Sequence, residues 1–430
     1  MCDANGQLTD EAAALIEQHQ AFLIFDKENW DLVAYGTWWP DQTRKISAFQ
    51  PKKVRYVRVS APAPKGIAIA DIRLYETEFI PPNASLRAWG PTIDFPLIPV
   101  AGAIDANSGE AVAWSSWGYN IFTGGKGGKT QTATRNGESQ SVTRRAITNT
   151  QHDMFCPGLS IDANGNFVVS GGQDARATSI YNTTVYDWFR AGHLNVFRGY
   201  QSSTTLSDGR IFLIGGSWQG GVGIKNGEVY DAKANAWTEI DGADVKKMYT
   251  QDQRTYRQDN YPWLFGWTNG SVFQAGPSVQ MNWFDAMCGK AVMYEQGKIL
   301  AFGGSPCQQK ASVLANAGGG MNYERTFHSS VVLPDGSVFH GGQVVGLPFN
   351  ESQPQMTPEL FIPEPKSATG GAWVKQQKNS IVRECHIISL LLRDGTVFTG
   401  GGGLCGDCDA NHFDGQIYTR VSAQFRWISS

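Results

Sequence analysis

Short apolar segments recur along most of the chain, each introduced by a turn. Every copy has a dipeptide that ends in glycine, then an apolar run, then usually a pair of glycines. Dipeptides such as Asp-Gly and Asn-Gly support the positive φ angles of tight hairpins, and the apolar run is typical of an inner, buried strand. The pattern therefore predicts one β unit repeated at the glycines Gly109, Gly165, Gly209, Gly270, Gly297, Gly336 and Gly395.

The spacing of these glycines indicates the architecture. They lie about 48 residues apart on average, a period typical of propellers with four-stranded blades. Single Asp-Gly hairpins occur in any β protein, but seven copies with the same following strand are hard to explain that way. The glycine pairs, which let backbones approach closely, favour the kelch type. We therefore expect an all-β fold with a seven-bladed kelch-type β-propeller over residues 86–420, followed by a short tail over residues 421–430.

One interval between repeats is too short for an ordinary blade. Gly270 and Gly297 are only 27 residues apart. We expect that a stretch near residues 283–285 has been lost there.

The residues before the propeller have a different pattern. Residues 53–59 and 69–76 alternate apolar with polar positions, as half-buried strands do, and Pro81-Pro82 is typical of a linker. The expected units are an N-terminal segment over residues 1–24, with an amphipathic helix at residues 9–20, and a partial β domain over residues 25–80.

Composition and charge exclude several classes of function. The net charge is −3 and only 17% of residues are charged, so the chain lacks the basic surface of a nucleic-acid-binding protein. No apolar run approaches the ~18–20 residues of a membrane span. The first 20 residues lack the features of a signal peptide, whereas four Asn-x-Ser/Thr sequons are compatible with export, so the compartment stays open. The seven cysteines leave at least one outside intrachain disulfides.

Three residues are candidates for chemistry near the propeller axis. Propellers place function in loops around the central channel, so site residues should come from several repeats. Cys156 precedes Pro-Gly, Tyr200 lies just before a repeat strand, and Trp218 directly follows Gly-Gly-Ser. Composition alone favours structural roles for them, because cysteine is often a small buried residue and large aromatics often belong to the core.

Other candidates lie in the last repeat and in a polar loop. His386 precedes the apolar strand IISLLL, and a lone histidine is more often structural than a ligand. Cys405 and Cys408 have CxxC spacing without a second pair, which excludes a zinc ribbon and favours a local disulfide or a structural loop, although His412 keeps a metal site open. Arg257 could bind sugar hydroxyls, but an arginine in such a loop is usually solvated.

Long stretches around these residues resemble the galactose oxidase family, the fungal radical-copper oxidases, and more distantly the glyoxal oxidases. The matching stretches run from about residue 89 to residue 418 and include HDMFCPG, RGYQSS, SDGRIFLIGGSWQGGV, RTFHSSVVLPDG and GGGGLCGDC. The segment KVRYVRV…IADIRLYE resembles the C-terminal half of the discoidin-like carbohydrate-binding domain, a β-sandwich, that precedes the propeller in that family.

The resemblance implies a role for each candidate residue. Cys156 and Tyr200 match the pair that forms a thioether cross-link, and the modified tyrosine is a copper ligand that holds a radical. Trp218 matches the indole stacked over that cross-link, and His386 matches one of two histidine ligands. The positions that match the family's substrate-binding residues are Arg257, Gln253, Phe122 and Phe349.

The implied reaction oxidises a primary alcohol, such as C6 of D-galactose, to an aldehyde and reduces O2 to hydrogen peroxide. The expected cofactors are one copper ion and the tyrosyl radical derived from the Cys156–Tyr200 thioether. The expected partners are a small carbohydrate or primary alcohol and O2, with glycans as a further partner, and the protein is expected to be a monomer. The resemblance also implies an extracellular protein, although no signal peptide is visible.

The sequence departs from the family pattern at the metal site. Cys385 stands where the family has an axial tyrosine, the proposed base for the alcohol proton, so a thiolate would have to take that proton. The second histidine ligand belongs to a C-terminal domain that does not follow Tyr418, and we expect a homologue truncated at both ends. The remaining ligand set is Tyr200, His386 and Cys385, and we expect impaired oxidase activity. The alternative is a non-catalytic propeller that binds glycans or proteins.

Overall fold

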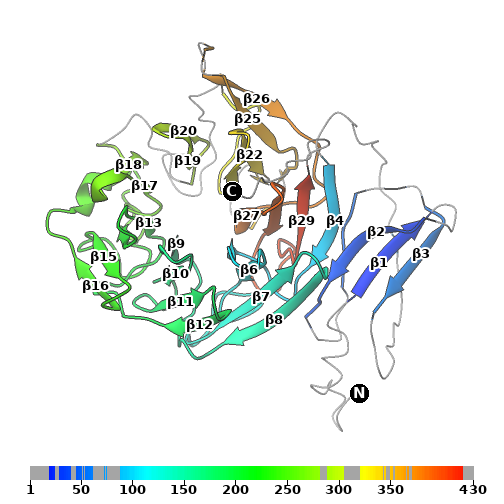
Figure 1. Cartoon of the computed structure of the whole chain (residues 1–430), viewed down its shortest axis with the longest axis horizontal. Helices are drawn as coiled ribbons and strands as arrows, with labels where there is room; N and C mark the ends of the chain where they lie inside the picture. Colours follow the sequence, from blue (N-terminus) through cyan, green and yellow to red (C-terminus); the bar gives the residue numbers. More distant parts are fainter. Residues whose placement is uncertain are drawn as a thin grey trace, which may run out of the picture.

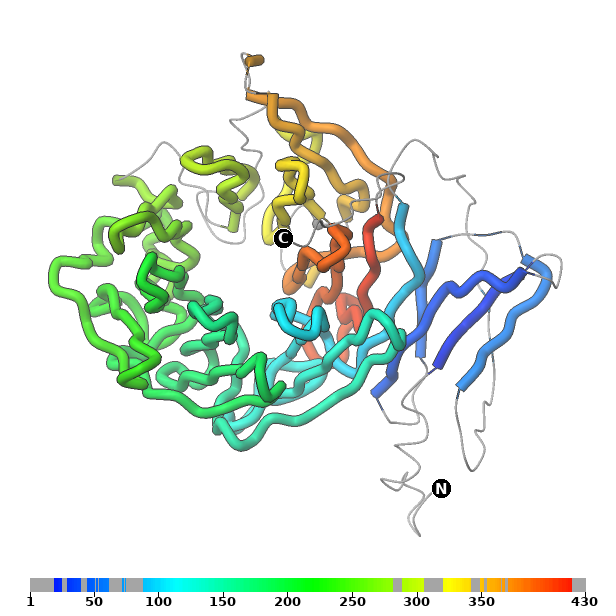
Figure 2. The backbone as a smooth tube through the Cα atoms, viewed as in Figure 1, coloured from blue at the N-terminus to red at the C-terminus, as the bar shows by residue number. Residues whose placement is uncertain are grey.

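In the computed structural model, β-strands arranged in a ring dominate the chain (Figures 1 and 2). The structure describes residues 19–24, 29–39, 45–50, 52, 54–61, 72, 74, 88–280, 288–304, 320–341, 343–344, 349–351, 354–364, 366–367 and 370–419. In these residues the helical elements are the short 3-10 turns η1 (Val245–Met248) and η2 (Thr268–Gly270). No helix in this part of the chain is long and apolar enough to cross a membrane.

The first three blades are complete four-stranded antiparallel sheets. Blade 1 contains β5 (Ala101–Ile104), β6 (Ala111–Trp114), β7 (Thr130–Asn136) and β8 (Ser141–Ile147). Blade 2 contains β9 (Gly158–Ile161), β10 (Phe167–Ser170), β11 (Thr178–Asn182) and β12 (Asp187–Arg190). Blade 3 contains β13 (Ser202–Thr205), β14 (Ile211–Ile214), β15 (Glu228–Asp231) and β16 (Ala236–Glu239).

Blades 4 and 5 each have two strands in the described residues, and blade 6 again has four. Blade 4 contains β17 (Trp263–Gly266) and β18 (Val272–Gly276), and blade 5 contains β19 (Lys290–Glu295) and β20 (Lys298–Phe302). Blade 6 contains β21 (Ser329–Val332), β22 (Val338–Gly341), β25 (Glu359–Pro363) and β26 (Gly371–Lys375), with the small pair β23 (Gln343–Val344) and β24 (Pro354–Gln355) beside it. The stretch near residues 283–285, where a loss was expected, lies outside the described residues.

Blade 7 is built from both ends of the propeller. β27 (Ile387–Leu391), β28 (Val397–Gly401) and β29 (Asp414–Thr419) come from the last repeat, and β4 (Ala88–Asp94) supplies the fourth strand. β4 pairs antiparallel with β29, so its hydrogen bonds close the ring (Figure 1). The all-β propeller expected from the repeats is therefore confirmed.

The apolar runs that mark the repeats are the second strands of their blades. The glycine turn joins the first strand to the second, as between β9 and β10. In the four-stranded blades the second strand is paired on both edges, and all four residues of β10 are buried. This burial explains why these strands are continuously apolar, as buried strands are.

The core lies between neighbouring blades. Trp114 of β6 and Trp188 of β12 are both almost fully buried, and their rings meet edge to face with centroids 5.6 Å apart. Phe167 of β10 belongs to the same cluster, so blades 1 and 2 share one apolar layer. Burying one such large side chain contributes roughly 1.5–3 kcal/mol.

A buried arginine–carboxylate pair recurs in three blades. In each, the arginine lies in the loop before the first strand and its partner lies on the third strand. Both side chains are almost completely buried, with nitrogen–oxygen separations of 2.6 to 3.1 Å. These pairs tie the axial loops to the outer part of each blade. The pairs are Arg198–Glu228, Arg325–Glu359 and Arg383–Asp414.

The N-terminal strands continue the sheet of blade 7. β1 (His19–Ile24) pairs with β2 (Asp31–Gly36) and β3 (Tyr56–Ser60), and β2 runs parallel to β4 (Figure 1). Gly36 is needed at this junction, because a Cβ there would lie 2.0 Å from the carbonyl oxygen of Asp94. His19 also joins the two parts through a 2.8 Å contact with the Asp94 carboxylate.

Of the predictions about the N-terminal part, the helix is wrong at its end and one strand is present in part. The helix expected over residues 9–20 is wrong at its end, because His19 and Gln20 belong to strand β1, whose backbone pairs with β2 and β3. The rest of that segment lies outside the described residues. The strand expected at residues 53–59 is present from Tyr56, and most of the one expected at residues 69–76 lies outside the described residues.

The buried His152 makes the stability of blade 2 depend on pH. Burial lowers the pKa of His152 from 6.5 to about 4. The unfolded chain therefore binds a proton between these pH values that the folded chain does not. Stability should fall as pH is lowered from 6.5 to about 4, by about 3 kcal/mol for this one residue.

This dependence can be measured by urea unfolding across that pH range. His152→Gln should flatten it, because glutamine cannot titrate but can still hydrogen-bond Ser179 or Gly171, the present partners of His152. The exposed His193 provides the control, and His193→Gln should keep the slope of the unchanged protein. Identical slopes for all three proteins would contradict the prediction.

Candidate active site

One repeat position places side chains at the propeller axis. Cys156, Tyr200 and His386 each lie nine residues before a repeat glycine, at the entrance to the first strand of blades 2, 3 and 7. The backbone of Cys156 has φ 56° and that of Tyr200 has φ 65°, in the left-handed region. The amide of Tyr200 donates to the carbonyl of Cys156 at 3.1 Å. Residues far apart in sequence thus meet at equivalent places.

Cys156, Tyr200 and Trp218 form one compact group. The Tyr200 hydroxyl and the Cys156 thiol are close enough to interact, and each shifts the pKa of the other. The Trp218 indole stacks on the Tyr200 ring, with centroids 4.6 Å apart and planes 27° from parallel. Burial raises the pKa of both Cys156 and Tyr200 well above their ordinary values, so both are protonated in the absence of a metal.

Glycines make this stacking possible. A Cβ on Gly199 would lie 2.4 Å from the Cε3 atom of Trp218, and one on Gly172 would lie 2.3 Å from the carbonyl oxygen of Phe155. Real Cβ atoms do not approach other atoms so closely, so both positions need glycine. The indole loop is also fixed from blade 4, because the amide of Ser217 donates to Asp259 at 2.7 Å.

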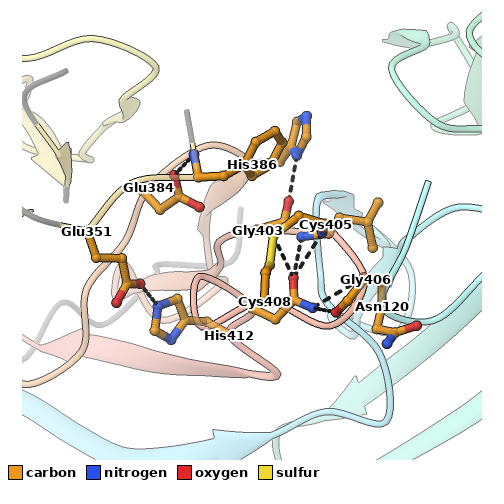
Figure 3. The surroundings of a disulfide bond; sticks show 12 residues. Asn120, Glu351, Glu384, His386, Gly403, Cys405, Gly406, Cys408 and His412 are labelled. Atoms are coloured by element: carbon orange, nitrogen blue, oxygen red, sulfur yellow. Dashed lines mark hydrogen bonds and ion pairs between the residues drawn. A yellow bond between two sulfur atoms is a disulfide. The ribbon is translucent and has the colours of Figure 1, made fainter. Parts of the chain in front are cut away.

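His386 is oriented for metal binding by its backbone contact. Its Nδ1 lies 2.8 Å from the carbonyl oxygen of Gly403 (Figure 3). A carbonyl can only accept, so Nδ1 carries the proton and the lone pair of Nε2 is free to bind a metal. Burial lowers the pKa of His386, and this favours the neutral ring that metals require.

Three phenylalanines surround the His386 ring. The centroid of Phe155 lies 5.0 Å away, that of Phe349 5.6 Å and that of Phe122 6.2 Å. Phe155 also contacts Trp218, with centroids 6.0 Å apart, so it lies between the indole and the imidazole. The imidazole is therefore held in an apolar setting that limits its rotation.

Cys385 faces the same centre as Tyr200. Its thiol is close enough to both Cys156 and Tyr200 to interact electrostatically with them, and burial raises its pKa well above the ordinary value. The neighbouring Glu384 is also buried, and its pKa is raised to about 8 by burial. Glu384 accepts a hydrogen bond from the amide of Phe349 at 2.6 Å and so fixes the loop that carries this aromatic ring.

The structure brings two of the four candidate substrate residues close together. Phe122 and Phe349 lie near each other, with centroids 6.3 Å apart, and both border His386. Arg257 is partly buried, and its Nη1 has no hydrogen-bond partner among the described residues. Gln253 is exposed. The two aromatic rings thus form an apolar surface beside the imidazole, and Arg257 keeps a donor available.

The Cys405–Cys408 loop has a structural role. The two cysteines form a disulfide, so neither is a thiolate ligand, and His412 instead contacts Glu351 at 2.5 Å (Figure 3). These contacts exclude the metal site that was open for Cys405, Cys408 and His412. The loop also supports the site. Leu404, next to Cys405, accepts a hydrogen bond at 3.3 Å from the amide of Phe122, whose ring lies beside His386.

The donor set fits a copper ion. Copper(II) favours imidazole nitrogen and anionic oxygen, and Cys385 would add a thiolate of the kind that Cu(I) prefers once a metal displaces its proton. The preset tautomer of His386 is the observation that supports this fit. Among the described residues, no three His, Cys, Asp or Glu side chains gather as a metal site.

Sequence reasoning missed one residue of this centre, Tyr261. Its ring lies 4.8 Å from that of Tyr200, between centroids, and its amide donates to the carbonyl of Tyr200 at 3.0 Å. In the segment YPWLFGW it resembles an ordinary core aromatic. The signal that could have identified it is the spacing, because Tyr261 also lies nine residues before a repeat glycine, Gly270.

Comparisons with known proteins agree with this site. No protein-family model matches the chain. Two curated galactose oxidases, from Gibberella zeae and from Gibberella zeae strain PH-1, are each 46% identical over 453 aligned positions, which cover 94% of this chain and 66% of the relative. The chain thus spans less than two thirds of the length of these relatives.

A solved structure extends the comparison to the fold. It is described as a novel fungal alcohol oxidase with catalytic diversity among the AA5 family, in complex with copper. It is 37% identical, with a TM-score of 0.70, and the match covers 78% of this chain and 76% of the other. Because both likenesses extend over more than three quarters of this chain, the chain belongs to the galactose oxidase family, the AA5 family.

Proposed function

We propose that this protein is a copper radical oxidase that converts a primary alcohol to an aldehyde. The observation that carries the proposal is the Cys156–Tyr200 pair, joined through a backbone hydrogen bond, in contact through its side chains and covered by Trp218. The alcohol loses two electrons and two protons. O2 takes up the two electrons and the two protons and becomes hydrogen peroxide. Copper held by these residues would supply one one-electron acceptor, and the phenol of Tyr200, once oxidised, would supply the second.

The protein's own residues would bind copper, shield the radical and receive a proton. Tyr200, His386 and Cys385 would hold the metal, with His386 binding through Nε2. The Trp218 indole covers one face of the Tyr200 ring and would exclude water from the radical. The thiolate of Cys385 would receive the alcohol proton, and we expect slower turnover than with a tyrosine there because a thiolate is itself easily oxidised.

We propose that the substrate is a sugar with a primary hydroxyl, such as D-galactose. The apolar faces of Phe122 and Phe349 would pack against the sugar ring beside His386. The unpaired Nη1 of Arg257 would donate to sugar hydroxyls, and Gln253 in the same loop would add a polar contact. We also propose that the protein acts outside the cell, as a monomer.

A peroxide assay tests this function. Purified protein loaded with copper should release hydrogen peroxide when D-galactose is added in the presence of oxygen. Tyr200→Phe should lower the release to the level without protein, because the variant lacks the phenol that stores the second electron. Peroxide release by the unchanged protein that does not exceed that of Tyr200→Phe would exclude the oxidase function.

That negative outcome would favour the alternative, a non-catalytic propeller that binds glycans or proteins. The observation on its side is Cys385, a thiol at the place of the family's axial tyrosine. Binding to a glycan array that survives removal of copper, without peroxide release, would support this binding function.

A further inference from the structure

A second tyrosine lies next to Tyr200 in the ring of axial residues. Tyr261 occupies the same repeat position in blade 4 that Tyr200 occupies in blade 3, and its backbone has φ 59°. Its amide donates to the carbonyl of Tyr200 at 3.0 Å, just as that of Tyr200 donates to the carbonyl of Cys156. The two phenols are therefore fixed to each other through the backbone.

The side chains of the two tyrosines are also in contact. Their ring centroids lie 4.8 Å apart with planes 33° from parallel, and the Tyr261 hydroxyl is close enough to that of Tyr200 to lower its pKa. Trp218 covers the Tyr200 ring, so Tyr200 contacts an indole, a thiol and a second phenol. The proposed roles of the thiol and the indole do not account for the second phenol.

We propose that Tyr261 is a positioning residue that donates a hydrogen bond to the phenolate oxygen of Tyr200 and thereby sets how easily Tyr200 is oxidised. This inference rests on the proposed function, in which Tyr200 is a metal-bound phenolate. Hydrogen bonds to a charged acceptor are roughly twice as strong as those between neutral groups. Such a bond stabilises the anion more than the neutral radical, which carries less charge on its oxygen.

The oxidation step involves a single electron. The phenolate of Tyr200 loses one electron to an external oxidant, which is an electrode in the test below, and becomes a neutral phenoxyl radical. Tyr261 keeps its own proton throughout, and no bond forms or breaks. Removing its hydroxyl should therefore make the oxidation of Tyr200 easier.

The test compares Tyr261→Phe with the unchanged, copper-loaded protein. Phenylalanine keeps the ring packing and removes only the donor. We expect the midpoint potential of Tyr200 to fall and the charge-transfer absorption band of the phenolate bound to Cu(II) to shift to longer wavelength. The affinity for copper, measured by competition with a chelator, should change less than threefold. Tyr186→Phe, at an exposed turn of blade 2, is the matched control and should change neither quantity.

The possible results distinguish a failure of this inference from a failure of the proposed function on which it rests. If Tyr261→Phe leaves the potential and the absorption band unchanged while the protein binds copper, the inference is wrong and the oxidase function stands. A loss of copper affinity greater than tenfold would make Tyr261 a ligand instead of a hydrogen-bond donor and would also overturn it. If the unchanged protein neither binds copper nor links Cys156 to Tyr200, the proposed function fails and this inference fails with it.

Discussion

Purified protein exposed to copper and oxygen is expected to yield one peptide species in which Cys156 is joined to Tyr200. The thiol and the phenol are already close enough to interact, so bond formation needs little movement. The new C–S bond replaces an S–H bond and an aromatic C–H bond. Oxygen takes the two hydrogens with their electrons and forms hydrogen peroxide. The linked species should therefore be lighter than the sum of its peptides by two hydrogens, which peptide mass spectrometry resolves.

Two variants make this experiment specific. Cys156→Ala should abolish this linked species completely, because it removes the sulfur atom that the link requires. Cys288→Ala removes a thiol from the same repeat position in blade 5 and should leave the link intact. If the unchanged protein never forms the linked species with copper and oxygen present, the site has lost its redox chemistry.

Arg198→Met should destabilise the protein by about 3–5 kcal/mol, the usual cost of breaking a buried ion pair. Arg198 and Glu228 are both fully buried, and their side chains lie 2.9 Å apart. Methionine leaves the carboxylate of Glu228 in the interior without its counter-charge. It also removes the hydrogen bonds that Arg198 donates to the carbonyls of Gly215 and Lys225. Chemical denaturation measures the loss.

The exposed pair Arg210–Asp208 provides the matched control in the same blade. Its side chains are 45% and 46% exposed, so Arg210→Met should not change the unfolding midpoint measurably. Arg198 also precedes Tyr200 by two residues, and its loss should reduce the yield of the Cys156–Tyr200 link. Equal midpoints for the two variants would show that burial adds nothing to the Arg198–Glu228 pair.

Much of the propeller could be predicted from local sequence. A turn such as Asp208-Gly209 and the apolar run of β14 are signals within a few residues, and their repetition revealed the blades. Cys156, Tyr200, Trp218 and His386 were identified as candidates, and the structure places the first three in one group. A bulky aromatic after a glycine pair, as at Trp218, is a signal that local pattern can carry.

Other features depend on contacts that no local pattern encodes. β4 contains Gly90 and Pro91, which are poor strand formers, and it becomes a strand because β29 and β2 pair with it. The helix expected over residues 9–20 fails at His19 for the same reason, since strand pairing outweighs helical periodicity there. Tyr261 was missed because its contact with Tyr200 exists only when blades 3 and 4 are packed together.

The closure of blade 7 sets the order in which the site is assembled. β4 is synthesised before any complete blade, yet its partner β29 is the last strand among the described residues. Pairing of such distant segments is slow, because the chain between them loses its freedom before the new contacts stabilise it. His386 begins this last blade, whereas Cys156 and Tyr200 belong to earlier ones. A nascent chain therefore presents Cys156 and Tyr200 well before His386, and under the proposed function the full set of copper ligands would come together only when this last blade forms.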